Sequence, residues 1–267
     1  MPAQLDHIDE IKSLFAELAS GPQEYDFQPP AMVSHAEQYA AQPERLRHYA
    51  KQVVCGRIMI FLAFSRMNTQ ALLHTYLLGV EARNPFPILL AARSQLELLS
   101  VVADTKRTIQ GHSGEHSENF LGRVRAVDEA LIKATFGTRS SVLKDLMPKI
   151  ELSRLRPVTK DDYGALTSTN VVTWLEKLSK SGAYPECMKD YARLCDYVHP
   201  NYGMNMLHVV ASPINSTLLR FSLSSQEPFE RAVTASASVM IRAARGTLAL
   251  MDEIQPPFGM GTVSYVA

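Results

Sequence analysis

This sequence has no excess of charge of either sign, because 27 lysine and arginine residues balance 27 aspartate and glutamate residues. A strongly basic field is what drives non-specific binding to nucleic acid. Any contact with nucleic acid must therefore come from a local patch of basic side chains. The patch that the sequence offers consists of Lys149, Arg154, Arg156 and Lys160.

Cysteine and long apolar runs are also scarce. The three cysteines, Cys55, Cys187 and Cys195, lack the C-x-x-C spacing of a metal site, and their odd number and apolar neighbours indicate reduced thiols. The most apolar run, Ile58–Phe64, is too short to cross a bilayer. The N-terminal residues include acids where a signal peptide has a basic block and then an apolar block. The sequence therefore predicts a cytoplasmic protein with no membrane segment.

Common catalytic fingerprints are missing: the sequence has no G-x-S-x-G elbow, no Walker loop and no dinucleotide-binding glycine pattern. The segment HSGEH, His112–His116, matches the zinc-peptidase pattern H-x-x-E-H, which needs a helix to project both histidines onto the metal. Gly111, Ser113 and Gly114 favour a loop instead, so we reject a zinc site. We expect neither a metal nor another cofactor.

What the sequence does have is the helical spacing of apolar residues. This spacing predicts helices at about 8–18, 43–67, 69–83, 86–110, 120–136, 171–182, 185–198 and 228–251, with shorter ones from about 34 and at 140–147. Asn68 and Asn170 suit the N-cap positions of two of these helices. Residues 219–223 alternate apolar and polar side chains, which is typical of a strand that could pair with residues 207–210.

The predicted fold is therefore an all-α helical bundle with at most one small β-hairpin near residues 207–224. The sequence shows no repeat and no clear domain boundary. We predict one all-helical domain over residues 1–255 and a C-terminal tail at 256–267, which has too few apolar residues to fold alone.

One predicted helix carries a narrow polar stripe in apolar surroundings. Arg93, Glu97 and Asp104 lie within roughly 40° of one another around the helix axis. Charged groups on a buried helix must be paired, because an unpaired buried charge is costly. Either Arg93 and Glu97 form a structural ion pair one turn apart, or the stripe faces a polar site supplied by another helix.

The segment YARLCDYVHPNYGMN places Arg193 six positions before His199, near the end of a predicted helix. Asp190 and Asp196 stand three residues on either side of Arg193, so an exposed salt bridge is one interpretation. Pro200 disfavours the helical conformation at His199 and ends the helix there. A cation at a helix C-terminus is favoured by the helix dipole. None of these features requires catalysis.

An arginine followed by four to six residues and then a histidine at a helix end resembles the signature of the HEPN superfamily. This group of all-α proteins includes many RNA-cleaving toxins and defence effectors. The resemblance covers residues 183–202 and the all-helical context, and Leu194 stands where the family often has a polar residue. It implies that Arg193 and His199 are catalytic and that Asn201 and Tyr202 contact the substrate.

The chemistry of RNA cleavage by its own 2′-hydroxyl explains such a pair. Histidine titrates near neutral pH and suits proton transfer, and arginine offers a fixed fork of donors to phosphate oxygens. Six steps along a regular helix leave Arg193 and His199 roughly 120° apart. Either the helix loosens before Pro200 or two chains each contribute to a shared cleft, and the resemblance implies the second.

We therefore expect a metal-independent ribonuclease that acts on RNA as a homodimer, as a toxin or phage-defence effector. A toxin of this kind would have an antitoxin or another partner protein. The alternative is a non-catalytic helical module that binds a partner or senses a signal.

Overall fold

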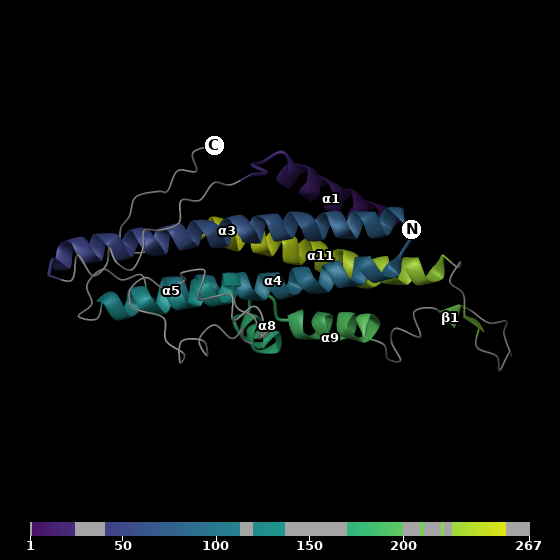
Figure 1. The fold of residues 1–267 in the computed structure, drawn as a ribbon. Helices are drawn as coiled ribbons and strands as arrows, with labels where there is room; N and C mark the ends of the chain where they lie inside the picture. The colour runs from purple at the N-terminus through teal and green to yellow at the C-terminus, as the bar shows by residue number, and fades with distance from the viewer. Residues whose placement is uncertain are drawn as a thin grey trace, which may run out of the picture. The chain divides into compact units, whose positions relative to one another are not determined.

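The structure, a computed structural model, describes residues 2–24, 41–112, 120–136, 170–199, 209–210, 220–221 and 226–254. These residues contain seven helices and one pair of short strands (Figure 1). The helices are α1 (Pro2–Ala19), α3 (Pro43–Glu81), α4 (Pro85–His112), α5 (Phe120–Phe136), α8 (Val171–Lys180), α9 (Cys187–Val198) and α11 (Glu227–Asp252). The predicted all-α helical bundle is confirmed.

The predicted hairpin is present in the part of its range that the structure describes. Strand β1 (Val209–Val210) pairs with strand β2 (Arg220–Phe221) in antiparallel register, with Val209 opposite Phe221. An isolated pair of strands is at best marginally stable in water. A side chain of α11 supports it, because Arg231 donates a hydrogen bond from Nη1 to the backbone oxygen of Val209.

Several helix ends follow local signals in the sequence. Helices α3 and α4 each begin at a proline, which suits the first turn because the N–H that proline lacks has no partner there. Helix α8 follows Asn170, whose side-chain oxygen accepts a hydrogen bond from the N–H of Val172 at 3.1 Å. This is the N-cap that the sequence predicts.

The predicted break at Asn68 is wrong. Residues Pro43–Glu81 form one continuous helix, and Asn68 is an exposed residue in its interior. Asparagine in a helix interior costs no more than about 0.7 kcal/mol relative to alanine. Burial of the next turns, including Leu73 and Tyr76, outweighs that cost. The helix ends at Glu81, two residues before Arg83 with its positive φ of 51°.

The chain divides into two compact units, and helices α3, α4, α8 and α11 each contribute residues to both. Unit 1 consists of Met1–Gln23, Arg66–Ser100 and Leu175–Leu248, and unit 2 of Glu24–Ser65, Val101–Trp174 and Ala249–Ala267. The single domain expected over residues 1–255 stays a prediction.

Buried polar side chains join helices within unit 1. The hydroxyl groups of Tyr76 on α3 and Ser236 on α11 are 3.1 Å apart. Gln95 on α4 donates a hydrogen bond from Nε2 to Oγ1 of Thr247 on α11 at 3.1 Å, and the same nitrogen is 3.4 Å from Oγ1 of Thr69 on α3. All five side chains are buried. Because buried polar groups need partners, these contacts favour one alignment of α3, α4 and α11 in unit 1.

Helix α1 is joined to the unit 1 part of α3, beside which it lies in Figure 1. The ring of Phe15 stacks on the ring of His74, with centroids 5.3 Å apart. Beyond the C-terminus of α1, Gln23 donates a hydrogen bond from Nε2 to the backbone oxygen of Ala19 at 3.0 Å. Gln70 of α3 in turn donates to Oε1 of Gln23 at 2.8 Å. The end of α1 is thus capped by a side chain that α3 holds.

Unit 2 contains a buried ion pair. Arg57 on α3 and Asp128 on α5 form this pair, and both side chains are buried. The attraction between two buried charges must offset the large cost of removing both from water. Nearby residues of the same unit add a cation–π contact, in which the Arg47 guanidinium carbon lies 5.7 Å from the centre of the Phe120 ring.

Helix α4 is the one helix in the described ranges with the length and mean hydropathy of a membrane span. Its most apolar window of 18 residues has a mean hydropathy of 1.4, and 50% of that window is buried inside the protein. Core helices of soluble proteins have the same properties, so these two numbers do not assign α4 to a membrane.

Some predictions concern residues outside the described ranges. They are the short helices from about 34 and at 140–147, the basic patch at residues 149–160, residues 113–116 of HSGEH, Asn201, Tyr202 and the tail at 256–267.

Candidate functional site

Helix α9 positions both residues of the predicted catalytic pair. Arg193 lies within the helix, and His199 directly follows its last residue. The buried side of α9 is formed by Cys187, Tyr191 and Leu194, a spacing of four and three residues that is typical of one helical face. Leu194 is fully buried, so its place directly after Arg193 serves the packing of α9. The helix therefore packs through one face and leaves Arg193 on another.

His199 is the C-cap of α9 and is exposed. Its φ of −86° and ψ of 147° are extended, which is the conformation that a following proline favours. Its backbone N–H still donates to the backbone oxygen of Cys195 at 3.0 Å, as in an α-helix. The predicted end of the helix at this histidine is confirmed.

Arg193 is also accessible to solvent, with 43% of its side chain exposed. Its Nη2 donates to Oδ1 of Asp190 at 2.8 Å, so the salt bridge allowed by the sequence forms on the N-terminal side. Asp190 also accepts a hydrogen bond from the hydroxyl of Tyr184 at 2.7 Å. Burial and this bond to Asp190 raise the pKa of Tyr184, so the phenol stays protonated. An exposed pair of this kind adds little stability and leaves Arg193 able to exchange partners.

Arg193 and His199 do not converge within one chain. Helix α9 stays regular to Val198, so the loosening that could have brought the two side chains together is not present. Six residues of regular helix keep them roughly 120° apart. The shared site between two chains, the other arrangement that the sequence allowed, stays a prediction.

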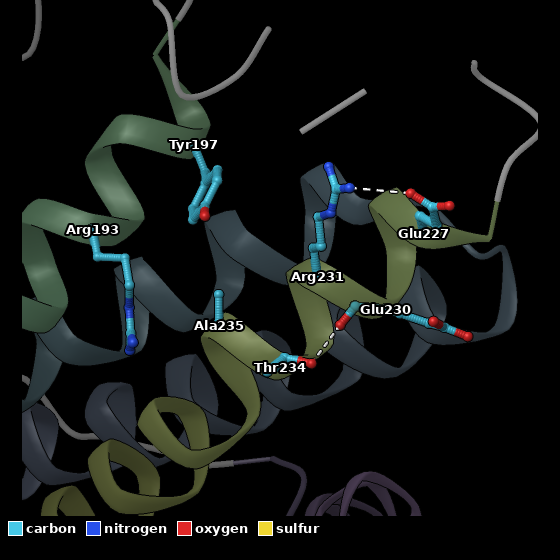
Figure 2. Close-up of a pocket in the computed structure, with 7 residues that line it drawn as sticks. All are labelled: Arg193, Tyr197, Glu227, Glu230, Arg231, Thr234 and Ala235. Atoms are coloured by element: carbon cyan, nitrogen blue, oxygen red, sulfur yellow. Dashed lines mark hydrogen bonds and ion pairs between the residues drawn. The ribbon is translucent and has the colours of Figure 1, made fainter. Parts of the chain in front are cut away.

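A groove of about 480 Å³ lies beside Arg193, between α9 and the first turns of α11 (Figure 2). It is lined by Arg193, Tyr197, Glu227, Glu230, Arg231, Thr234 and Ala235. Figure 2 shows Tyr197 and Arg193 projecting from α9 on one side, with Arg231 and Thr234 on α11 on the other. The two arginines and two glutamates balance in charge, so the groove is polar rather than basic.

The sequence analysis did not single out Arg231, which organises the α11 side of this groove. Its Nη2 donates to Oε2 of Glu227 at 3.1 Å, and its Nη1 holds the backbone of Val209 in strand β1. The spacing of four residues between Glu227 and Arg231 is a usable signal for the ion pair. The contact with Val209 carries no signal in the sequence.

The polar stripe of α4 meets α9 at Arg93. Nε of Arg93 donates to Oε1 of Glu97 at 3.0 Å, so the predicted ion pair is confirmed. Nη2 donates to the hydroxyl of Tyr191 on α9 at 3.2 Å, and the guanidinium carbon lies 5.3 Å from the centre of that ring. The structural ion pair is therefore present, and Arg93 has one further polar partner on another helix; a polar site facing the whole stripe stays a prediction.

Electrostatics keep these groups in their ordinary charge states. Partial burial lowers the pKa of the Arg93 guanidinium, but the bond to Tyr191 and the charge of Glu97 outweigh this and raise it above its usual value. The pKa of Tyr191 is raised to about 12, mainly by burial; the bond from Arg93 lowers it, and the charge of Glu97 and the Cys195 thiol raise it. Arg93 is therefore a cation and Tyr191 a neutral phenol at physiological pH.

Asp104, the third member of the predicted stripe, has partners of its own. Its Oδ1 pairs with Arg107, and its Oδ2 accepts a hydrogen bond from Nε1 of Trp174 at 3.0 Å. It stands eleven residues beyond Arg93 on α4, which is about 16 Å along the helix axis. The structure therefore does not combine Asp104 with Arg93 and Glu97 in one site.

The described residues contain no group of three or more histidine, cysteine, aspartate or glutamate side chains that could hold a metal ion. Comparisons with protein-family models, with characterised proteins and with solved structures gave no significant match. The structure assigns an all-helical protein, and the resemblance to the HEPN superfamily rests on the residues of the Arg193–His199 segment.

Proposed function

We propose that this protein is a metal-independent, HEPN-like ribonuclease in which Arg193 and His199 act together at a site shared by two copies of the chain. The observation that supports this proposal is that both side chains are exposed, Arg193 in the second half of α9 beside a polar groove and His199 at the C-cap of the same helix. Exposed arginine and histidine side chains on a short helix are free to meet the same groups of a second copy.

The reaction needs only groups that this pair can supply. The 2′-hydroxyl of RNA attacks the adjacent phosphorus and loses its proton, while the 5′-oxygen of the next nucleotide leaves and gains one. His199 would take or give a proton in this exchange. Arg193 would bind the phosphate oxygens as negative charge increases on them, after exchanging Asp190 for the phosphate.

The geometry of α9 supports a site shared by two chains. Because one regular helix directs the two side chains roughly 120° apart, a single chain presents either the arginine or the histidine to a given phosphate. A two-fold axis beside α9 would bring Arg193 of one copy toward His199 of the other. We therefore propose a cytoplasmic homodimer, and a toxin or phage-defence role in which an antitoxin or other partner protein restrains it.

The first prediction concerns cleavage of an unstructured RNA by purified protein in the presence of EDTA. Arg193→Ala and His199→Ala should each lower the cleavage rate by about a hundredfold or more, because each removes a group used in the transition state. Both residues are exposed, so the melting temperature should change little. Arg245→Ala is the control, because Arg245 is an exposed arginine of the same unit that also forms an ion pair, with Glu10, outside the groove.

Equal cleavage by the wild type and both site variants would assign the activity to a contaminant or to another site. Sedimentation of the wild type as a monomer at high micromolar concentration would reject the shared site. Mixing the inactive Arg193→Ala and His199→Ala proteins provides a further check. A dimer with composite sites should recover part of its activity, because random exchange makes about half of the dimers mixed and each mixed dimer contains one intact pair.

The non-catalytic module is the second candidate, and one observation favours it. Arg193 and Arg231 each form an ion pair with an acidic residue of the same helix, and the groove that they line has no net charge. A groove of this kind suits a peptide or a small polar ligand as well as RNA. If this module is correct, no RNA cleavage will exist for the site variants to abolish.

A further inference from the structure

The side of α9 that faces α4 is distinct from the side that carries Arg193. Tyr191, Cys195 and His199 follow one another at intervals of four residues, so each lies only about 40° further around the helix than the one before. Arg193 lies about 160° from Cys195 around the same axis. His199 therefore ends a row that begins at Tyr191, where α9 contacts Arg93.

Helix α4 supplies the other side of this row. Helices α4 and α9 run in opposite directions (Figure 1), so moving from Tyr191 toward His199 corresponds to moving from Arg93 toward Pro85. Leu90 and Phe86 lie in that direction, within about 60° and 20° of Arg93 around the α4 axis. Phe86 is about 10 Å along the axis from Arg93, which matches the distance of about 12 Å from Tyr191 to His199.

Phe86 and Leu90 are exposed, at 41% and 39%, on the same side of α4 as Arg93, which contacts α9. The described residues therefore leave both side chains accessible to solvent, although α9 extends alongside this part of α4. They are two of the five large apolar side chains in the described ranges that are markedly exposed. An exposed aromatic ring beside an exposed histidine is a surface on which a nucleobase can stack.

Arg93 has donors left to offer on the same row. A guanidinium group has five N–H bonds, and the hydrogen bonds to Glu97 and Tyr191 use two of them. The side chain is 21% exposed, so it is held in place by its partners and still accessible to solvent. A positioned arginine with free N–H groups is suited to a phosphate.

We propose that Phe86, Leu90, Arg93, Tyr191, Cys195 and His199 form a binding strip for single-stranded RNA, which we call the α4–α9 strip. A base stacks on Phe86 near His199, and a phosphate further along the strand binds Arg93. The strip rests on the proposed function, because it places the strand that leads to His199. It adds contacts within one chain, whereas the catalytic pair requires two chains.

The contacts differ from those expected of the groove beside Arg193. The groove lies between α9 and α11 and has a balanced charge, whereas the strip combines an aromatic ring, an aliphatic side chain and a cation. Stacking tolerates any base, so the strip should bind single strands with little sequence preference. A duplex should bind less well, because its bases are not free to stack on Phe86.

The test measures the affinity of a labelled, 2′-O-methylated RNA oligonucleotide by fluorescence anisotropy, because this probe lacks the 2′-hydroxyl and cannot be cleaved. Phe86→Ala should weaken binding roughly 5- to 100-fold, the range expected for the loss of one stacked base. Leu78→Ala is the matched control, because Leu78 is an exposed apolar side chain on α3 of the same unit. The Leu78→Ala protein should bind the probe with the affinity of the wild type.

Two variants test Arg93, one that keeps its charge and one that removes it. Arg93→Lys keeps a cation but loses the fork of N–H groups, so affinity should fall while the protein stays folded. Arg93→Gln removes the charge, and the slope of log affinity against log salt should become shallower by about 0.7, as for one lost phosphate contact on a single strand. Circular dichroism of each variant reports whether the helices are retained.

Unchanged affinity in Phe86→Ala overturns the strip, and so does a wild type that does not bind the probe. A change in sedimentation of Phe86→Ala without a change in RNA affinity also overturns it, because the strip would then be an interface between copies. Cleavage of unmodified RNA is measured in parallel. A wild type that cleaves RNA with no contribution from Phe86 rejects only the strip, whereas a wild type that binds but never cleaves rejects the proposed ribonuclease.

Discussion

Glu97 shows how a single residue on α4 can be tested apart from the proposed chemistry. Its side chain is 30% exposed and its partner Arg93 is 21% exposed, so their ion pair is half-buried rather than fully buried. The cost of breaking it should therefore lie between that of an exposed pair and that of a buried one. Arg93 also keeps its bond to Tyr191 when Glu97 is removed.

We predict that Glu97→Ala lowers the free energy of unfolding by about 1 kcal/mol. Asp9→Ala, which breaks the exposed pair of Asp9 with Lys12, should change it by less than about 0.5 kcal/mol. Urea denaturation of both variants measures the difference. Equal effects would mean that partial burial adds nothing to the pair between Arg93 and Glu97.

At the scale of residues, the sequence predicted contacts that are local and missed those that are not. The pair of Arg93 with Glu97 and the pair of Arg193 with Asp190 follow from spacings of four and three residues. Tyr191, the third partner in the Arg93 cluster, is 98 residues away from Arg93 in the chain. Helical periodicity places a residue on a face, but it does not say which other helix that face meets.

Two asparagines show how the contribution of one residue type to stability differs between a helix end and a helix interior. Asn170 caps α8, and Asn68 is exposed in the middle of α3, where the sequence suggested a cap. The same residue type therefore has opposite consequences at the two positions. Only the cap accepts a hydrogen bond that the helix would otherwise lack.

We predict that Asn170→Ala lowers the free energy of unfolding by about 1 kcal/mol. Asn68→Ala should raise it by up to about 0.7 kcal/mol, since alanine has the higher helix propensity. The urea midpoints of the two variants should move in opposite directions. A loss of stability in Asn68→Ala would show that this asparagine has a structural role that a mid-helix position does not explain.

Element boundaries were predictable where proline, asparagine or a break in periodicity marked them. The ends of α5 and the start of α4 follow such signals. The continuity of α3 through Asn68 was not predictable, because asparagine is both a good N-cap residue and a residue that a helix interior tolerates. Burial of residues such as Leu73 and Tyr76 settles that choice, and burial depends on the rest of the fold.

Across the molecule, the described part of unit 1 holds three tyrosines whose pKa values are raised. Burial raises those of Tyr76 and Tyr191 from 10.0 to about 12, and burial with the bond to Asp190 raises that of Tyr184. A phenol whose pKa is raised in the folded protein holds its proton more tightly there than in the unfolded chain. The stability contributed by these phenols is therefore complete below pH 10 and is lost as the pH rises toward 12.

We predict that thermal stability falls steeply between about pH 10 and pH 12. Tyr191→Phe, which cannot ionise, should make this fall shallower while losing the bond to Arg93 at neutral pH. Melting curves across this range measure both effects. A stability that stays constant up to about pH 12 would mean that the tyrosines ionise as they do in the unfolded chain.

The fold class of the whole molecule was predictable because apolar residues recur with one period along almost the whole chain. The single domain over residues 1–255 and the homodimer stay predictions. Neither follows from periodicity, because helices α3, α4 and α11 continue from one compact unit into the other and a partner surface has no period of its own.

The six-residue interval between Arg193 and His199 determines the angle between their side chains around the α9 axis. Each residue added to α9 before His199 would turn the histidine by about 100°. One added residue would carry it from the row of Tyr191 to within about 20° of Arg193, whereas three would leave it within about 60° of its present direction. In the proposed ribonuclease, the length of this interval, and not the identity of its residues alone, would therefore decide whether one chain or two supply the arginine and the histidine.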